Sequence, residues 1–377
     1  MSLGDRGSPT SALIRVSLVD KKILKLPVMS TRHARSFFVD LIKLLAAQLI
    51  VLHHFSAYGP LAQAVRETWP LLIDHLYSDA RLAVQVFLVI GGYLAAQSLA
   101  ARRDIHPLQL IQQRYLRLMP SYVLALCWIS ALTWLLRPMI SGDWLVPQPT
   151  LTTVLAHLSL LQSVLDVPAL STGVWYVAID FQLFALMALL AFVLKTPLAR
   201  SCAVAGLCVA SMLFFNRMDG MDVWAVYFFG AYGLGILAAW AKRSAADRMI
   251  FSLTLLFGMA AWLEHPRSRL ALAMICAVVL VSISHRQILA STFGKWMGLL
   301  ADSSYAMFLT HFGVLIIASA LWEQLALKGS VKALWMAAAA WLLSNVVGWM
   351  FHHWAEKPLL AKVVNKKSRV IQAASAA

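Results

Sequence analysis

Residues 37–57 read FFVDLIKLLAAQLIVLHHFSA, an almost unbroken apolar run. A helix needs about 20 apolar residues to cross the hydrocarbon core of a bilayer, so this run is long enough to span a membrane. It nevertheless carries Asp40, Lys43 and His54. A charged side chain inside a bilayer costs roughly 2.5–3.5 kcal/mol on insertion scales, which makes such residues candidates for function. The run therefore predicts a membrane fold and a functional site within it.

The rest of the chain repeats this apolar pattern. The 377 residues are 60% hydrophobic and 13% charged, whereas soluble domains carry about 25% charged residues. The sequence therefore predicts an all-α, polytopic integral membrane protein with about ten transmembrane helices. The expected spans are 37–57, 82–101, 119–136, 174–194, 200–216, 222–241, 249–264, 270–284, 297–321 and 333–354.

The segments outside these spans are short. Residues 151–166 form an amphipathic stretch, which we expect to be an interfacial or re-entrant helix. Residues 1–28 resemble a polar, basic N-terminal tail, and Met29 would itself serve as an ordinary start. We expect one membrane domain at 29–360 and a basic tail at 361–377.

The charged residues are distributed unevenly. The chain has 32 Lys and Arg residues against 17 Asp and Glu residues, a formal charge of +15. A nucleic-acid-binding protein would gather this excess on one soluble face, but here it lies in short pieces between apolar runs. Most of these cations fall in alternate loops, which the positive-inside rule assigns to the cytoplasm. We therefore predict that both termini are cytoplasmic and that the protein has no nucleic-acid partner.

The polar residues of the first span share one helix face. Asp40 and Lys43 are three residues apart, close enough to pair. Lys43 and His54 are eleven apart, which is three helical turns or about 16 Å, whereas His53 points about 100° away from His54. A neutral imidazole can serve as a general base near pH 7. The alternative is that these residues merely mark the two membrane boundaries.

Five further motifs follow this span in order. They are LAVQVFLVIGGYLAA (82–96), QQRYLRLMPSYVLAL (112–126), VWYVAIDFQLFAL (174–186), SSYAMFLTHFGVL (303–315) and Glu356-Lys357-Pro358. With Asp40, Lys43 and His54 they resemble the acyltransferase-3 family. Its first helix carries an acidic residue, an Arg three positions later and a His eleven beyond that Arg. Lys43 stands where the family has Arg, which offers a planar fork of donors rather than a point charge.

The resemblance implies a membrane-bound O-acyltransferase of the bacterial inner membrane. It would move an acyl group, often acetyl, from cytoplasmic acyl-CoA to a hydroxyl of a glycan or similar acceptor outside. His54 matches the family's catalytic histidine, and either Asp180 or His311 could orient it or serve only in helix packing. Arg114 and Arg117 would hold the phosphates of CoA. We expect no cofactor beyond the acyl-CoA donor.

Other classes of function fit the sequence less well. A polytopic transporter of a glycan, lipid or small solute would also use many helices with buried polar groups. It would favour repeated halves and matching broken helices, and the sequence has neither. The four cysteines lie in apolar segments with no CxxC pair, so we expect neither a disulfide nor a metal site.

Overall fold

The fold is all-α, as the sequence predicts. The computed structural model describes residues 37–102, 105–140, 142–282 and 292–362, with the backbone alone for 292–296. The predicted N-terminal tail at 1–28, and all but the first two residues of the predicted tail at 361–377, lie outside these ranges.

Every expected span corresponds to a helix. In the described part of the chain, eight helical stretches are long and apolar enough to cross a membrane, and two shorter apolar helices accompany them. This confirms the prediction of a polytopic membrane protein. The helices are α1 (Phe37–Ala57), α4 (Ala83–Ala100), α5 (Pro107–Leu136), α7 (Trp175–Val193), α8 (Pro197–Leu213), α9 (Ala225–Trp240), α10 (Ala245–Glu264), α11 (Ser268–Ser282), α12 (Thr292–Gln324) and α13 (Ser330–Phe351).

The connections contain helices that the sequence analysis did not anticipate. Helices α2 (Gly59–Arg66) and α3 (Pro70–Ser78) fill the loop between α1 and α4, and each begins with a proline in its first turn. Proline favours this position because it has no backbone N–H to satisfy and its φ angle suits a helix. The turn η5 (His352–Glu356) extends α13 as a π-helix.

The predicted amphipathic helix at 151–166 is shorter than expected. Helix α6 (Leu151–Leu158) opens with a Thr150 capping box and ends before Leu160. Leu160 has a φ of 56° and Asp166 a φ of 49°. These left-handed conformations are incompatible with a continuing right-handed helix. The expectation of a helix up to residue 166 is therefore wrong.

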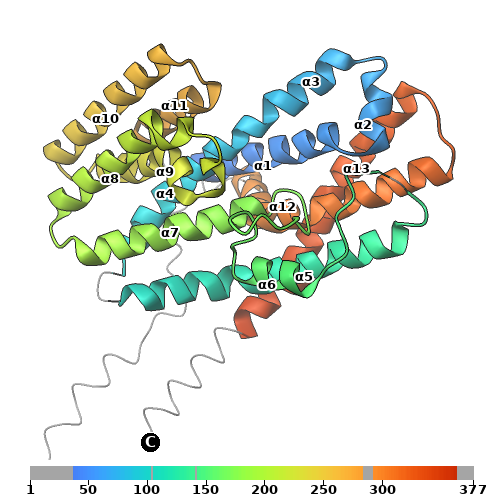
Figure 1. The fold of residues 1–377 in the computed structure, drawn as a ribbon, viewed down its shortest axis with the longest axis horizontal. Coiled ribbons are helices and arrows are strands. Elements are labelled where there is room, and N and C mark those ends of the chain that lie inside the picture. Colours follow the sequence, from blue (N-terminus) through green and yellow to red (C-terminus); the bar gives the residue numbers. More distant parts are fainter. Residues whose placement is uncertain (1–36, 103–104, 141, 283–291, 363–377) are drawn as a thin grey trace, which may run out of the picture.

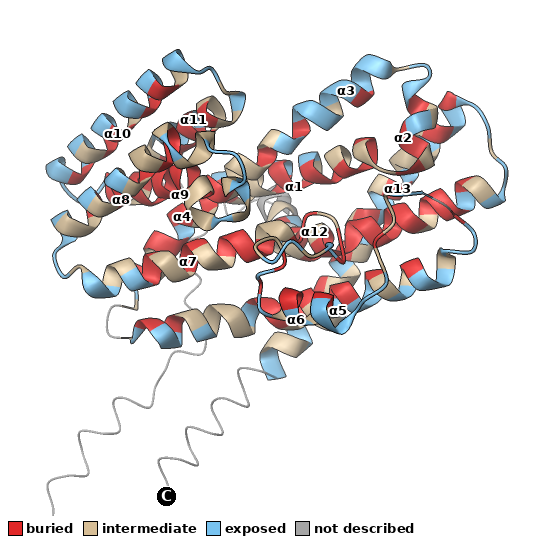
Figure 2. Cartoon of the chain, viewed as in Figure 1, coloured by how far each residue is buried: buried red, intermediate tan, exposed pale blue. Residues whose placement is uncertain are grey.

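The helices pack as two lobes (Figure 1). One lobe gathers α4, α7, α8, α9, α10 and α11 around a shared apolar core. The other gathers α1, α2, α5, α12 and α13. Figure 2 shows buried residues concentrated along α9 and α12, whereas α3 and α10 are largely exposed. Exposed apolar side chains on the outer helices suit contact with lipid.

Glycines allow α4 and α9 to pack closely within the first lobe. A Cβ added to Gly92 of α4 would overlap the backbone of Tyr232, and one added to Gly235 of α9 would overlap the backbone of Val89. Each helix thus presents a glycine to the backbone of the other. Small residues at such crossings allow membrane helices to approach closely and gain van der Waals contact.

A hydrogen-bonded triad fixes α1 in the second lobe. Gln48 donates to Asn345 Oδ1 at 2.7 Å and accepts from Trp341 Nε1 at 2.8 Å. Both partners lie on α13. An interhelical hydrogen bond in a membrane protein contributes about 0.6 kcal/mol on average. These contacts hold the rotation of α1, and hence the direction in which His54 points.

Candidate active site

Two histidines from distant parts of the chain meet inside the second lobe. His54 lies in the last turn of α1, and His311 lies in α12, which packs against α1. Their rings stack with centroids 4.9 Å apart and planes inclined by 7°. Nδ1 of His54 lies 2.7 Å from Nε2 of His311. His54 is 6% exposed and His311 is fully buried.

The hydrogen bonds determine where the protons lie. Nδ1 of His311 is 3.2 Å from the carbonyl oxygen of Met307. A carbonyl oxygen can only accept, so Nδ1 of His311 carries the proton and its Nε2 is an acceptor. His54 must then donate from Nδ1 to His311 Nε2. Nε2 of His54 consequently keeps its lone pair, and it makes no hydrogen bond with any described residue. This is the protonation state of a general base.

A glycine packs directly over the His54 ring. Gly173 has a φ of 78°, and a Cβ placed there would lie 3.1 Å from His54 Cε1 and 3.1 Å from Phe308 Cζ. Tyr58 lies on another side, with ring centroids 5.9 Å apart. Burial raises the pKa of the Tyr58 hydroxyl, so this group stays protonated beside the imidazole.

His157 anchors the loop that carries Gly173. Its Nδ1–H donates to the carbonyl of Thr153 at 2.7 Å, and its Nε2 accepts from the backbone N–H of Leu170 at 3.1 Å. Burial lowers the pKa of His157, which favours the neutral form that this pair of bonds requires. His157 therefore holds the loop against the His54 ring.

The adjacent His53 has different surroundings. Its ring packs 5.6 Å from that of Tyr77 in α3. Its Nδ1 is buried and has no hydrogen-bond partner among the described residues. The two neighbouring histidines thus face different helices, and only His54 meets His311.

Asp40 and Lys43 lie near the opposite end of α1. Both are half-buried. The eleven residues between Lys43 and His54 correspond to a rise of about 16 Å along the helix. The structure therefore places Lys43 on the stripe below His54 rather than in contact with it.

Asp180 pairs with Arg114 and not with His54. The Arg114 Nη2 group donates to Asp180 Oδ2, and the guanidinium lies 5.4 Å from the Phe184 ring centroid. Arg117, one turn further along α5, is exposed. The charges of the two arginines still act on each other, and Arg117 also interacts electrostatically with Glu356. Arg114 joins α5 to α7, whereas Arg117 has no ion pair with any described residue.

A buried histidine–carboxylate pair lies in the η5 turn. His352 Nδ1 is 2.6 Å from Glu356 Oε2, and both residues are buried. His352 Nε2 and the Tyr305 hydroxyl are also buried, without a hydrogen-bond partner in the described part of the chain. The late motif containing Glu356 therefore forms part of a buried polar cluster, which the sequence alone did not indicate.

Sequence patterns did not identify the groups that support His54. Gly173 directly precedes the 174–186 motif, and its position after Ser171 and Thr172 was the available signal. The carbonyl of Met307 had no signal, because a backbone acceptor carries no side-chain identity. Within the residues described, no three His, Cys, Asp or Glu side chains form a cluster able to hold a metal ion.

Comparison with known proteins connects this geometry to a family. Residues 36–353 match the sequence model of a family described as an acyltransferase domain. The match includes His54 and His311, the Arg114–Asp180 pair and nearly all of the described helices. No curated protein and no solved structure gives a significant match to the chain.

Proposed function

The chain belongs to this acyltransferase family, and from that premise we propose that it is an acyl-CoA-dependent O-acyltransferase. Its multi-pass helical fold makes it a membrane acyltransferase. In the proposal it resides in a bacterial inner membrane and acts on a hydroxyl group of an extracytoplasmic glycan or similar acceptor. The acyl group is proposed to be acetyl.

The unprotonated Nε2 of His54 carries this proposal. The chain of donors and acceptors from the Met307 carbonyl through His311 leaves that nitrogen free to take a proton. Transfer of an acyl group to an alcohol requires removal of the hydroxyl proton as the oxygen attacks. A positioned general base accelerates such a step by about 10²–10⁴-fold.

The proposed reaction balances without a cofactor. The acceptor hydroxyl gives its proton to His54 Nε2 while its oxygen forms a bond to the thioester carbonyl carbon. The carbon–sulfur bond then breaks, and the imidazolium returns the proton to the departing CoA thiolate. His311 Nε2 accepts from the His54 Nδ1–H throughout, which favours the imidazolium that forms in between.

The donor is proposed to reach this site from the side that carries the basic loops. Arg117 is exposed, and although the charge of Glu356 acts on it, it forms no close ion pair with a described residue, so it is the better candidate for holding a CoA phosphate. Arg114 is engaged with Asp180. We therefore assign the phosphate contact to Arg117 and a structural role to the Arg114–Asp180 pair.

The proposal is tested with the full chain reconstituted in liposomes. Purified protein receives acetyl-CoA labelled in the acetyl group, together with an extract of envelope glycans. We expect release of the CoA thiol and a matching amount of label in the glycan fraction. Liposomes without protein, and acetate in place of acetyl-CoA, are the controls.

The same assay separates the enzyme from a transporter. Label that accumulates inside the liposomes without thiol release would refute the proposed transfer and favour transport. Mass spectrometry of envelope glycans from a deletion strain, compared with the wild type, then identifies the acceptor by the loss of an acyl group.

A further inference from the structure

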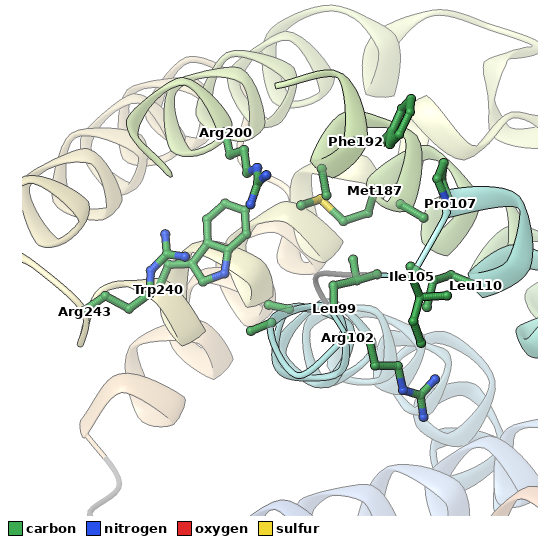
Figure 3. A pocket seen from close by; sticks show the side chains of 14 residues that line it. Leu99, Arg102, Ile105, Pro107, Leu110, Met187, Phe192, Arg200, Trp240 and Arg243 are labelled. Atoms are coloured by element: carbon green, nitrogen blue, oxygen red, sulfur yellow. The ribbon is translucent and has the colours of Figure 1, made fainter. Parts of the chain in front are cut away.

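A small cavity lies between the end of α4, the start of α5 and the helices α7, α8 and α9. Its volume is about 80 Å³. Its apolar lining includes Leu99, Ile105, Leu110 and Met187, and three arginines surround it: Arg102, Arg200 and Arg243. In Figure 3, Arg200 and Arg243 lie at the Trp240 end, whereas Arg102 lies at the opposite end beyond Leu99.

The arginines retain unused hydrogen-bond donors. Arg200 bonds the Leu194 carbonyl through Nε at 2.6 Å, and its two terminal nitrogens bond no described residue. The side chain of Arg102 makes no hydrogen bond or ion pair with any described residue, whereas its backbone bonds Leu99 and Ile105. Arg243 lies over the Trp240 ring at 4.3 Å and pairs with Asp247 at 3.1 Å. The cavity lining contains no Asp or Glu among the described residues, so the site has an excess of positive charge.

The size of the cavity limits its ligand. Pockets for drug-sized or cofactor-sized ligands occupy roughly 300–1,000 Å³. The cavity, at about 80 Å³, lies well below that range. It suits a small anionic group such as one phosphate.

Exposed apolar residues surround the same cavity. Phe192 lines it and is 46% exposed, while the neighbouring Leu108 and Val193 are 63% and 66% exposed. In a membrane-spanning chain such side chains face lipid hydrocarbon. The loops here are those that the charge pattern assigns to the cytoplasm, where the leaflet surface is negatively charged. A phosphate bound at the arginines would thus have its acyl chains beside Phe192.

We propose that this cavity binds the phosphate of an anionic phospholipid. Arg200 and Arg243 hold the phosphate at the Trp240 end, Arg102 adds positive charge at the opposite end, and the exposed apolar side chains of α5 and α7 contact the lipid tails. Because the cavity joins α4 and α5 to α7, α8 and α9, the bound lipid stabilises the packing of these helices at this end of the bundle. The inference does not depend on the acyl-transfer reaction.

The test uses the delipidated full chain in a neutral detergent. Native mass spectrometry measures binding of dioleoylphosphatidylglycerol and dioleoylphosphatidylcholine, and thermal unfolding reports stabilisation by each. We expect wild type to bind the anionic lipid at least about tenfold more tightly and to unfold at a higher temperature with it. Equal binding of the two lipids would overturn the proposal, and this readout requires no variant.

Variants locate the site. The double variant Arg102→Gln/Arg200→Gln should weaken phosphatidylglycerol binding about 10–100-fold, since the charge-assisted hydrogen bonds of Arg200 and the positive charge of Arg102 are lost. Arg248→Gln is the matched control, because Arg248 is an exposed residue in the first turn of α10, close in sequence to Arg243, and does not line the cavity. It should change the affinity less than about twofold. An equal loss in the control would overturn the assignment.

Soluble phosphates distinguish the source of the ligand. Coenzyme A and inorganic phosphate, each at millimolar concentration, should leave bound phosphatidylglycerol in place. Displacement of the lipid by either compound would overturn the lipid assignment and indicate a site for soluble phosphate.

Discussion

Replacing His311 tests whether the second histidine positions the first. His311 accepts the His54 Nδ1–H at 2.7 Å and is itself fixed by the Met307 carbonyl. In His311→Ala this acceptor is lost, and the His54 proton is no longer confined to Nδ1. Molecules that carry this proton on Nε2 of His54 lack the lone pair that the proposed general base uses. In His311→Gln the amide oxygen can accept the same hydrogen bond, so the tautomer is kept.

The magnitude follows from the hydrogen bond to the imidazolium that forms during transfer. A hydrogen bond to a charged group contributes about 1.5–3 kcal/mol, and about 1.4 kcal/mol corresponds to tenfold in rate. We therefore expect His311→Ala to lower kcat about 10–150-fold. KM for acyl-CoA should change little, because the bond strengthens only after binding. His311→Gln should recover to within about tenfold of wild type.

The assay is thiol release from acetyl-CoA by purified variants in liposomes, at equal protein amounts and with thermal unfolding as the control for folding. A well-folded His311→Ala variant with wild-type kcat would refute the positioning role. So would a loss expressed in KM alone, or an equal loss in the Ala and Gln variants, because neither follows from tautomer control.

Three further predictions concern other parts of the structure. Gly173→Ala should lower the transfer rate about 10–100-fold, because the left-handed backbone disfavours Ala and the new Cβ would push the His54 ring; a wild-type rate would contradict that packing. Asp180→Asn should destabilise the fold by about 3–5 kcal/mol, because it leaves Arg114 unpaired. Replacing both partners with Leu and Met should cost less, and equal losses of stability in thermal unfolding in detergent would contradict the ion pair. Lys43→Arg should keep activity and Lys43→Met should lose most of it, measured in membranes with an immunoblot for expression; an active Met variant would make Lys43 a boundary residue only.

The helices of this fold could be predicted because each one is an apolar run with its own start and end. Near position 160 the prediction failed, since the conformation of Leu160 depends on tertiary contacts and Leu itself favours a helix. Helices α2 and α3 were missed for a related reason. They are short, and the loop that holds them lacks the long apolar run on which the span assignment depends.

The site could be predicted only in part. The spacing along α1 separates His53 from His54, because consecutive helix positions point about 100° apart. The contact between His54 and His311 joins residues 257 positions apart, and no local pattern reports it. The partner of Asp180 was likewise open, because pairing depends on how α5 rotates against α7. What could not be predicted is thus the packing between helices.

The most direct test of the central claim compares the two adjacent histidines. His54→Ala and His53→Ala are purified as full chains, reconstituted at equal amounts, and assayed for transfer of labelled acetyl from acetyl-CoA. The proposed general base predicts a loss of about 10²–10⁴-fold for His54→Ala and measurable turnover for His53→Ala, with both variants unfolding near the wild-type temperature. An active His54→Ala variant beside an inactive His53→Ala variant would contradict the assignment.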